Sequence, residues 1–295
     1  MVLWKTYHLA LGLKDALDAL SSLPGSARLI AGGTDLLLDL QQGRCPPVEL
    51  LVDITQVPEL RCLEVRGGSL FIGAAVPLRQ LTESSLVEQH APALQQACSL
   101  VGGPQVRNTA TLGGNVAHAL PAGDGSIALL ALDAVAEIAS TAGNRLAPIA
   151  DLYQGPGKSA LKPDQEILVG FYLPLRQAGE SSAFRRVMRP QGVALPILNM
   201  AIWLRKYNGV FDDLRIALGP AGPVPYRAKE AETALIGKPL TEEAFESASR
   251  AIQEHAHFRS SPQRASAAYR QHLSKILFQE TLLAAWEDAD NGIHG

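Results

Sequence analysis

Two glycine-rich segments contain the backbone and the side chains best suited to binding an anion. Residues 31–35 read AGGTD, and residues 107–124 contain Gly113 and Gly114 between Thr111 and Asn115. Glycine lets peptide N–H groups approach a ligand closely, and a run of such amides forms a concave nest that holds phosphate oxygens without a lysine. One glycine pair is usually only a turn, but two such segments in one chain predict two clamps on a single diphosphate.

The first glycine segment has the pattern of a strand, a turn and a helix start. The mostly apolar residues 27–30 precede it, and three leucines at 36–38 follow it. This arrangement directs backbone N–H groups at an anion. A carboxylate at a helix start favours the helix dipole, so we expect Asp35 to cap the helix and to point away from phosphates. In the second segment, Arg107 either pairs with a phosphate or fastens the loop, and both alternatives stay open.

The composition is that of a globular protein. The chain has 295 residues, 47% hydrophobic and 19% charged, which allows two domains with a sizeable core. Its net charge of -3 gives no reason to expect a nucleic-acid or membrane partner. Lysines and aspartates interrupt any apolar run in residues 1–20. We therefore expect no signal peptide, no spanning helix and a cytoplasmic location.

Cysteine use indicates a reducing compartment. Cys45, Cys62 and Cys98 are widely spaced and form no CxxC pair, which argues against a disulfide framework. An iron–sulfur cluster usually needs four thiolates, so we expect none in this chain. Cys98 is expected to be a small core residue rather than a redox thiol.

The first 176 residues combine helical and strand patterns, which predicts an α+β nucleotide-binding region. Apolar residues at helical spacing predict helices at 13–20, 36–40, 76–100 with breaks, and 125–132. Apolar or alternating runs bounded by glycine and asparagine predict strands at 50–54, 62–65, 69–72, 135–139, 146–149 and 167–173. The helix at 125–132 is expected to pack against the second glycine segment.

The polar residues 176–182 predict a flexible seam before a second region. Strands are predicted at 183–188, 197–206 and 211–218, with a hairpin at Asn208-Gly209. Beyond residue 226 the spacing is helical, with starts predicted at Thr241 and Ser261. Residues 180–290 are therefore expected to form a three-stranded antiparallel sheet with helices.

Four motifs occur in the order found in a known family: AGGTDLL at 31–37, residues 102–124, GPGKSALKPDQEIL at 155–168 and RASAAYRQHL at 264–273. With them, nearly the whole chain resembles the FAD-binding medium subunit of the xanthine dehydrogenase and carbon monoxide dehydrogenase class of molybdenum hydroxylases. The resemblance implies a PCMH-type, vanillyl-alcohol-oxidase-like FAD-binding fold over residues 1–176. It further implies two α+β subdomains, at about 1–57 and 58–176, and a flavoprotein C-terminal domain over 180–290.

The resemblance also implies partners and an electron path. In the family, this subunit assembles with a small subunit carrying two [2Fe–2S] clusters and a large subunit carrying molybdopterin, as a dimer of heterotrimers. Electrons from substrate hydroxylation pass through the clusters to FAD and on to NAD+ or another acceptor. The substrate pocket lies in the large subunit, so the substrate cannot be read from this chain. Oxygen, a quinone and a carrier protein stay open beside NAD+ as the acceptor.

The family's flavin contacts, carried over by position, fall on five parts of the chain. Residues 29–36, through backbone amides and the Thr34 hydroxyl, would hold the pyrophosphate from one side, and residues 111–115 would hold it from the other. Asp124 would accept hydrogen bonds from sugar or ribityl hydroxyls. The full set is Leu29, Ile30, Ala31, Gly32, Gly33, Thr34, Asp35, Leu36, Val101, Gly102, Ala110, Thr111, Leu112, Gly113, Gly114, Asn115, Ala117, Asp124, Leu168 and Arg185.

Three of these residues would face the flavin ring. Leu168 matches an apolar contact, and Arg185 stands where relatives often have a lysine. A cation near the N1/C2 edge stabilises negative charge on the reduced ring. Val101 departs from relatives that place a stacking aromatic there. His118 is either a proton donor, a covalent flavin attachment point or, as we prefer, a residue that fills space beside the cofactor.

Two other functions remain as alternatives. The first alternative is a free-standing flavin-dependent oxidoreductase with its own substrate pocket. The second is a non-catalytic scaffold that has lost FAD. The RASAAYRQHL motif argues against the first, because free-standing relatives have different substrate domains. The intact glycines of both segments, with Asn115 and Asp124, argue against the second. The sequence shows no acid–base pair or activated nucleophile, as expected for a subunit that transfers electrons.

Overall fold

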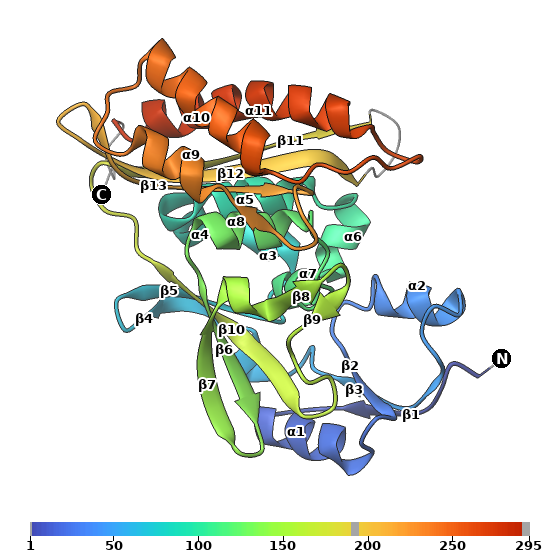
Figure 1. Ribbon diagram of the computed structural model, residues 1–295. Coiled ribbons are helices and arrows are strands. Elements are labelled where there is room, and N and C mark those ends of the chain that lie inside the picture. The colour runs from blue at the N-terminus through green and yellow to red at the C-terminus, as the bar shows by residue number, and fades with distance from the viewer. Residues whose placement is uncertain (1, 190–194, 291–295) are drawn as a thin grey trace.

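The computed structural model describes residues 2–189 and 195–290 of the chain. Its N-terminal part is a parallel three-stranded sheet, with α1 (Leu13–Ser22) and α2 (Leu36–Gln41) as the connections (Figure 1). The expected helices at 13–20 and 36–40 are confirmed. In sheet order the strands are β1 (Trp4–Leu9), β3 (Val48–Asp53) and β2 (Ala27–Ile30). The first glycine segment follows β2 at the carboxyl end of this sheet.

A five-stranded antiparallel sheet forms the middle of the molecule. The predicted hairpins are confirmed around Gly67-Gly68 and around Gly143. In sheet order the strands are β4 (Leu63–Arg66), β5 (Ser69–Gly73), β10 (Glu166–Pro174), β6 (Val135–Ser140) and β7 (Gly143–Pro148). A small hairpin of β8 (Tyr153–Gly155) and β9 (Lys158–Ser159) precedes β10.

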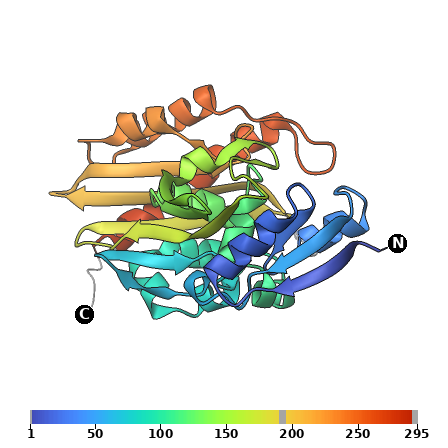
Figure 2. The ribbon, with the colours of Figure 1, turned by 90° about the horizontal axis from the view of Figure 1, so that it is seen from below.

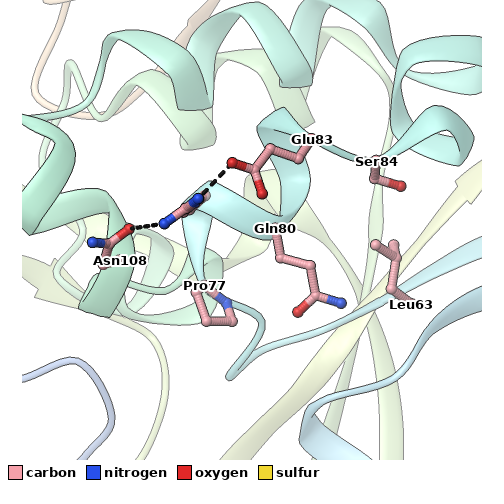
Figure 3. A pocket seen from close by; sticks show the side chains of 7 residues that line it. Leu63, Pro77, Gln80, Glu83, Ser84 and Asn108 are labelled. Carbon is pink, nitrogen blue, oxygen red and sulfur yellow. Dashed lines mark hydrogen bonds and ion pairs between the residues drawn. The ribbon is translucent and has the colours of Figure 1, made fainter.

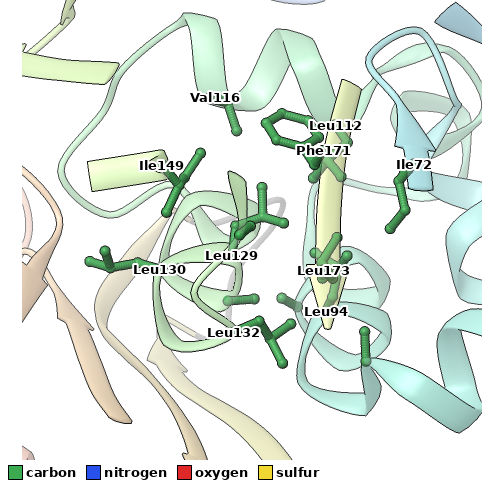
Figure 4. Close-up of a cluster of buried hydrophobic side chains, with 14 of the residues drawn as sticks. Ile72, Leu94, Leu112, Val116, Leu129, Leu130, Leu132, Ile149, Phe171 and Leu173 are labelled. Atoms are coloured by element: carbon green, nitrogen blue, oxygen red, sulfur yellow. The ribbon is translucent and has the colours of Figure 1, made fainter. Parts of the chain in front are cut away.

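Helices fill the connection from β5 to β6. Ser84 caps one of them and Pro92 begins the next, so the predicted helical stretch 76–100 is broken into three. The helices are α3 (Leu78–Thr82), α4 (Ser85–His90), α5 (Pro92–Leu100), α6 (Pro104–Thr109), α7 (Leu112–Ala117) and α8 (Asp124–Ala131). All eight residues of α8 are buried, and its apolar side chains form the centre of the largest core (Figure 4).

The C-terminal region is an antiparallel sheet covered by helices. Its strands are β11 (Glu180–Met188), β12 (Pro196–Tyr207), β13 (Val210–Gly219) and β14 (Tyr226–Arg227), and its helices are α9 (Lys229–Leu235), α10 (Glu242–His255) and α11 (Ala267–Asp288). The prediction of three strands was wrong by one, because β14 has two residues and is too short to show a periodic pattern. The Asn208-Gly209 hairpin is confirmed.

Two further expectations for this region need correction. Residues 176–182 are not a flexible seam: β11 begins at Glu180, and Ser182 is buried and accepts a hydrogen bond from the Ala93 backbone N–H at 3.1 Å. Polar residues here pair inside the protein. Helix α11 does not start at Ser261, which bridges to Ala265 in a turn; Ser266 caps the helix by accepting from the Tyr269 N–H at 3.2 Å. The start at Thr241 is confirmed.

The C-terminal sheet lies between two cores. Along β12, Met200 and Ile202 face α9, α10 and α11, whereas Ala201 and Trp203 face the core around α5 and α8. Figure 1 shows the three C-terminal helices on the outer face of the sheet and α5 and α8 beneath it. A third core joins α1, the N-terminal sheet and the other face of the five-stranded sheet, which lie side by side in Figure 2. The chain thus has the expected α+β fold.

Candidate functional site

A cavity of about 780 Å³ brings the two glycine segments together. It is also lined by the start of α8, by residues of β10 and β11, and by the turn that precedes α11. All the predicted site residues line it except Leu112 and Arg185. Its volume lies within the roughly 300–1,000 Å³ that is usual for small-molecule and cofactor sites.

The two glycine segments touch each other at Gly32. A Cβ atom at this position would lie 2.0 Å from the Thr109 carbonyl oxygen and 2.8 Å from the Ala110 Cα. Both are backbone atoms, so only glycine permits this approach. The next residue, Gly33, has a φ of +65°, in the left-handed region that favours glycine. The two bends therefore close on one cavity, as the hypothesis of two clamps requires.

Free backbone amides line the first segment. Among the residues that the structure describes, none accepts a hydrogen bond from the backbone N–H groups of residues 31–36. Unpaired N–H groups without an acceptor are costly when water is excluded. A row of them along a cavity is the expected form of an anion-binding nest.

The second segment is built differently from the expected nest. Gly113 and Gly114 lie in the first turn of α7, and neither has a positive φ. Their amides are already used: the Gly113 N–H donates to the Ala74 carbonyl at 2.9 Å, and the Gly114 N–H donates to the Thr111 hydroxyl at 3.1 Å. The Asn115 N–H also has a partner, the Thr111 carbonyl. This segment therefore shapes the cavity wall and does not supply a second row of free amides.

Gly113 should tolerate substitution less well than its neighbour. A Cβ at Gly113 would lie 2.5 Å from the Ala74 Cβ and 2.6 Å from its carbonyl oxygen, whereas one at Gly114 would meet only the Thr111 hydroxyl at 3.1 Å. We expect Gly113→Ala to lower the free energy of unfolding by about 1–3 kcal/mol and Gly114→Ala to change it by less than about 1 kcal/mol. Denaturant unfolding of the two variants measures the difference, and equal values would contradict the packing described.

Leu112 belongs to the core and not to the cavity. Its side chain is fully buried, and a Cβ at Gly125 would lie 2.9 Å from one of its methyl carbons. The Leu112 side chain does not line the cavity, because α7 turns it toward α8, and a flavin contact at this residue stays a prediction. The adjoining Asn115 does line the cavity, and its Oδ1 is buried without a hydrogen-bond partner among the described residues.

Asp124 is held in a buried ion pair. Arg186 Nη1 donates to its Oδ2 at 2.5 Å, and Asn199 Nδ2 donates to its Oδ1 at 2.7 Å. The Asp124 and Arg186 side chains are 5% and 6% exposed. Burial raises the pKa of the Asp124 carboxyl, while the Arg186 charge and the Asn199 amide oppose that rise. Both Asp124 carboxylate oxygens thus already accept hydrogen bonds from protein side chains. The sequence predicted a contact to a sugar hydroxyl and did not predict this ion pair.

Of the two adjacent arginines of β11, Arg186 is the one that lines the cavity. Arg185 donates to the Gln96 side-chain oxygen at 3.1 Å and to the Phe184 carbonyl at 2.8 Å, and it does not line the cavity. Successive residues of a strand point to opposite faces, so only one of the two arginines of β11 can face the site. A positive charge at this wall therefore comes from Arg186 and not from the predicted Arg185, and the flavin contact itself stays a prediction. Arg186 Nε has no hydrogen-bond partner among the described residues.

The remaining predicted residues have simpler surroundings. Asp35 is at the N-cap of α2, but its side chain caps nothing and lies 3.9 Å from His118 Nδ1, at the cavity wall. The expected capping role is wrong. Arg107 fastens the loop, because it donates to the carbonyls of Val101 and Gly102 at 3.1 and 2.8 Å. Leu168 lines the cavity beside a β-bulge in β10.

Cys98 is a core residue, as expected. The side chain is fully buried in the main core, and burial raises the pKa of its thiol, with the Asp124 charge adding to the rise. A protonated, inaccessible thiol has no redox role.

Within residues 2–189 and 195–290, no cluster of histidine, cysteine and carboxylate side chains is arranged to hold a metal ion. No helix in the same residues is both long and apolar enough to cross a membrane.

The prediction missed three arginines of the C-terminal region. Arg259, Arg264 and Arg270 line the cavity, together with Ser261 and Gln263. Two of them lie in the RASAAYRQHL motif, for which the sequence predicts no ligand contact. A usable signal was present: residues 259–270 contain three arginines and no acidic residue.

A second, shallower hollow lies on the outer side of α3 (Figure 3). Its charged groups are already paired, since Arg79 Nε lies 2.7 Å from Glu83 and Arg79 Nη1 lies 3.4 Å from the Asn108 side-chain oxygen. Such an exposed i,i+4 pair is typical of a solvated helix face. None of the predicted site residues lines this hollow, so it does not compete with the glycine-lined cavity as the functional site.

Comparison with known proteins gives matches over nearly the whole chain. Residues 4–176 match the model of the FAD binding domain in molybdopterin dehydrogenase, and residues 182–285 match the model of the CO dehydrogenase flavoprotein C-terminal domain. The chain is 37% identical to the xanthine dehydrogenase FAD-binding subunit of Escherichia coli O157:H7 over 283 residues, 95% of each chain. It is 30% identical to the carbon monoxide dehydrogenase medium chain of Hydrogenophaga pseudoflava, over 95% of this chain and 96% of the relative.

Solved structures show the same fold. The carbon monoxide dehydrogenase of Hydrogenophaga pseudoflava superposes with a TM-score of 0.92 at 30% identity, covering 97% of this chain and 99% of that one. Quinoline 2-oxidoreductase from Pseudomonas putida 86 gives a TM-score of 0.89 at 29% identity, covering 97% and 98%. These matches extend from the N-terminal sheet to α11, so they include every wall of the cavity.

Proposed function

The chain belongs to the family of FAD-binding medium subunits of the xanthine dehydrogenase and carbon monoxide dehydrogenase class, and on that premise we propose that it passes electrons from [2Fe–2S] clusters of a small partner subunit through FAD to NAD+ or another acceptor. A large partner subunit carries molybdopterin and the substrate pocket. The chain is thus one subunit of an oxidoreductase, and its own task is to hold and tune the flavin. The observation that supports this function best is the cavity closed by Gly32, with free amides along one wall.

The residues present fit FAD. A dinucleotide needs donors for its diphosphate, room for close backbone approach and an apolar wall for its ring system. The amides of residues 31–36 supply the donors, Gly32 supplies the close approach, and Leu168 supplies apolar surface. When bound, FAD supplies a carrier that takes up electrons and releases them to an acceptor.

The other walls of the cavity have separate tasks in this proposal. Arg186 places a positive charge at the site, which favours an anionic, reduced flavin ring, and Asp124 with Asn199 holds that charge in place. Val101 and Leu168 exclude water from the ring. His118 fills space beside the cofactor. These assignments, the dimer of heterotrimers and the domain limits at 57, 176 and 180 stay predictions.

We expect the purified chain to take up FAD and to keep it oxidised when xanthine or carbon monoxide is added without partner subunits. The reason is that the proposed substrate pocket and molybdenum lie outside this chain. The measurement is the visible absorbance of the flavin, with dithionite as the control that it can be reduced. Substrate-dependent bleaching of the isolated chain would instead support a free-standing oxidoreductase. A chain that takes up no FAD would contradict the proposed function.

A further inference from the structure

Three arginines on the C-terminal side of the cavity form a positive cluster without a counter-ion. Arg270, on α11, is 1% exposed, and Arg259 and Arg264 lie on the turn before it. None of the three forms an ion pair with a carboxylate in the described residues. The residues outside the description, 1, 190–194 and 291–295, contain no aspartate or glutamate. The sequence therefore offers no acidic side chain there that could have been missed.

Arg270 is held in place with part of its guanidinium unused. Its Nη1 donates to the Arg259 carbonyl at 2.7 Å, which fixes the turn, and its Nε is buried without a partner among the described residues. Burial lowers the pKa of the guanidinium, and the charges on Arg264 and Arg259 lower it further. A buried cation that also repels its neighbours is unfavourable unless an anion pairs with it.

The supply of hydrogen-bond donors in the rest of the cavity indicates what the arginine cluster could bind. Of the two glycine segments, the first offers a continuous row of free amides among the described residues, whereas the amides of residues 113–115 are used within the protein. A single nest leaves much of a diphosphate without donors. Arginine is well suited to the rest, because its planar fork of N–H groups matches phosphate oxygens.

We propose that Arg259, Arg264 and Arg270 bind a phosphate group at the C-terminal wall of the cavity. The phosphate belongs either to the diphosphate of FAD or to a second, phosphorylated ligand that exchanges electrons with the flavin. The identity of the ligand rests on the proposed flavin function. The anion site itself rests on the unpaired cluster.

The test uses the full chain with the double variant Arg259→Gln/Arg264→Gln. Both side chains are exposed, so the fold should survive their replacement. Arg250→Gln is the matched control, since Arg250 is an exposed arginine of α10 that does not line the cavity. Two quantities are measured: FAD affinity, from quenching of flavin fluorescence, and the rise in Tm caused by inorganic phosphate at constant ionic strength, with and without FAD.

Each source of the phosphate gives its own result. If the cluster binds the FAD diphosphate, the double variant loses about tenfold to a hundredfold in FAD affinity, the loss expected for charge-assisted hydrogen bonds. If it binds a second ligand, FAD affinity is unchanged, and phosphate stabilises the FAD-loaded wild type but not the FAD-loaded variant. Arg250→Gln behaves as wild type in both cases.

Equal FAD affinity and equal phosphate response in the double variant and the wild type would overturn the proposal. A failure of the proposed flavin function looks different. In that case the wild type takes up no FAD, yet phosphate still raises its Tm and the double variant loses this response. Arg270→Lys is a further variant that keeps the charge but removes the fork, and it should weaken the same binding step as the double variant.

Discussion

Replacing Gly32 with alanine is expected to abolish FAD retention. The added Cβ would lie 2.0 Å from the Thr109 carbonyl oxygen, 2.6 Å from its carbonyl carbon and 2.8 Å from the Ala110 Cα. These atoms are backbone, so no rotamer change relieves the overlap, and one segment must move away from the other. That movement displaces the row of free amides that follows Gly32 and opens the cavity where the two segments meet.

The expected size follows from overpacking, which costs about 1–3 kcal/mol in a well-packed site. If most of this strain is relieved by separating the segments, the geometry for the diphosphate is lost and flavin content should fall at least about tenfold, since 1.4 kcal/mol is one factor of ten. The measurement is the ratio of FAD to protein after reconstitution and gel filtration, together with Tm. Gly12→Ala is the control, because no atom lies within 4 Å of a Cβ at that position. A Gly32→Ala protein with full flavin content would contradict two segments in contact at the site.

The glycine segments could be predicted from the sequence because their signal lies in a few adjacent residues. Residues 31–35 carry their signal in adjacent letters, and so do the Asn208-Gly209 hairpin and the Thr241 cap. The contact between Gly32 and Thr109 has no such signal, because no residue pattern in either segment indicates that it packs against the other. The resemblance to a family placed both segments on one ligand, and the structure supplies the physical reason in the missing Cβ.

Composition does not predict whether the amides of Gly113 and Gly114 are free or hydrogen-bonded within the protein. Two adjacent glycines suit a nest and a close-packed helix start equally well. Here the second applies, because the backbone of Ala74 approaches within reach of the Gly113 N–H, and Thr111 caps the helix. Which of the two is formed depends on the turn after β5, which comes from elsewhere in the chain. The predicted nest is therefore not formed by the amides of Gly113 and Gly114, although both residues line the cavity.

Arg185 and Arg186 show a second limit. Alternation along a strand implies that one of the pair faces the cavity, but it does not say which one. The phase is set by partners far away in sequence: Asp124 is 62 positions from Arg186, and Asn199 is 75 positions from Asp124. The same distance hides the arginines at 259–270, whose significance appears only when the turn before α11 is seen to line the cavity.

Replacing Arg186 with glutamine is expected to destabilise the protein and to make bound FAD harder to reduce, whereas Arg185→Gln should do neither to a comparable extent. Removing Arg186 leaves the Asp124 carboxylate buried, with the Asn199 amide as its one remaining donor among the described residues. Breaking a buried pair in this way costs about 3–5 kcal/mol. Adding Asp124→Asn to the variant removes the unpaired charge and should recover part of this loss.

The effect on the flavin separates a role toward the cofactor from a purely structural one. Loss of a positive charge at the cavity wall should shift the two-electron midpoint potential of bound FAD to more negative values, by about 30 mV for each 1.4 kcal/mol of lost stabilisation of the reduced ring. Arg186→Lys keeps the charge and should retain most of the potential even if it loses stability. Spectroscopic redox titration of the FAD-loaded variants gives the values, and denaturant unfolding gives the stabilities. A midpoint potential that shifts in Arg185→Gln but not in Arg186→Gln would contradict this role for Arg186. It would instead support Arg185 as the residue that stabilises the reduced flavin.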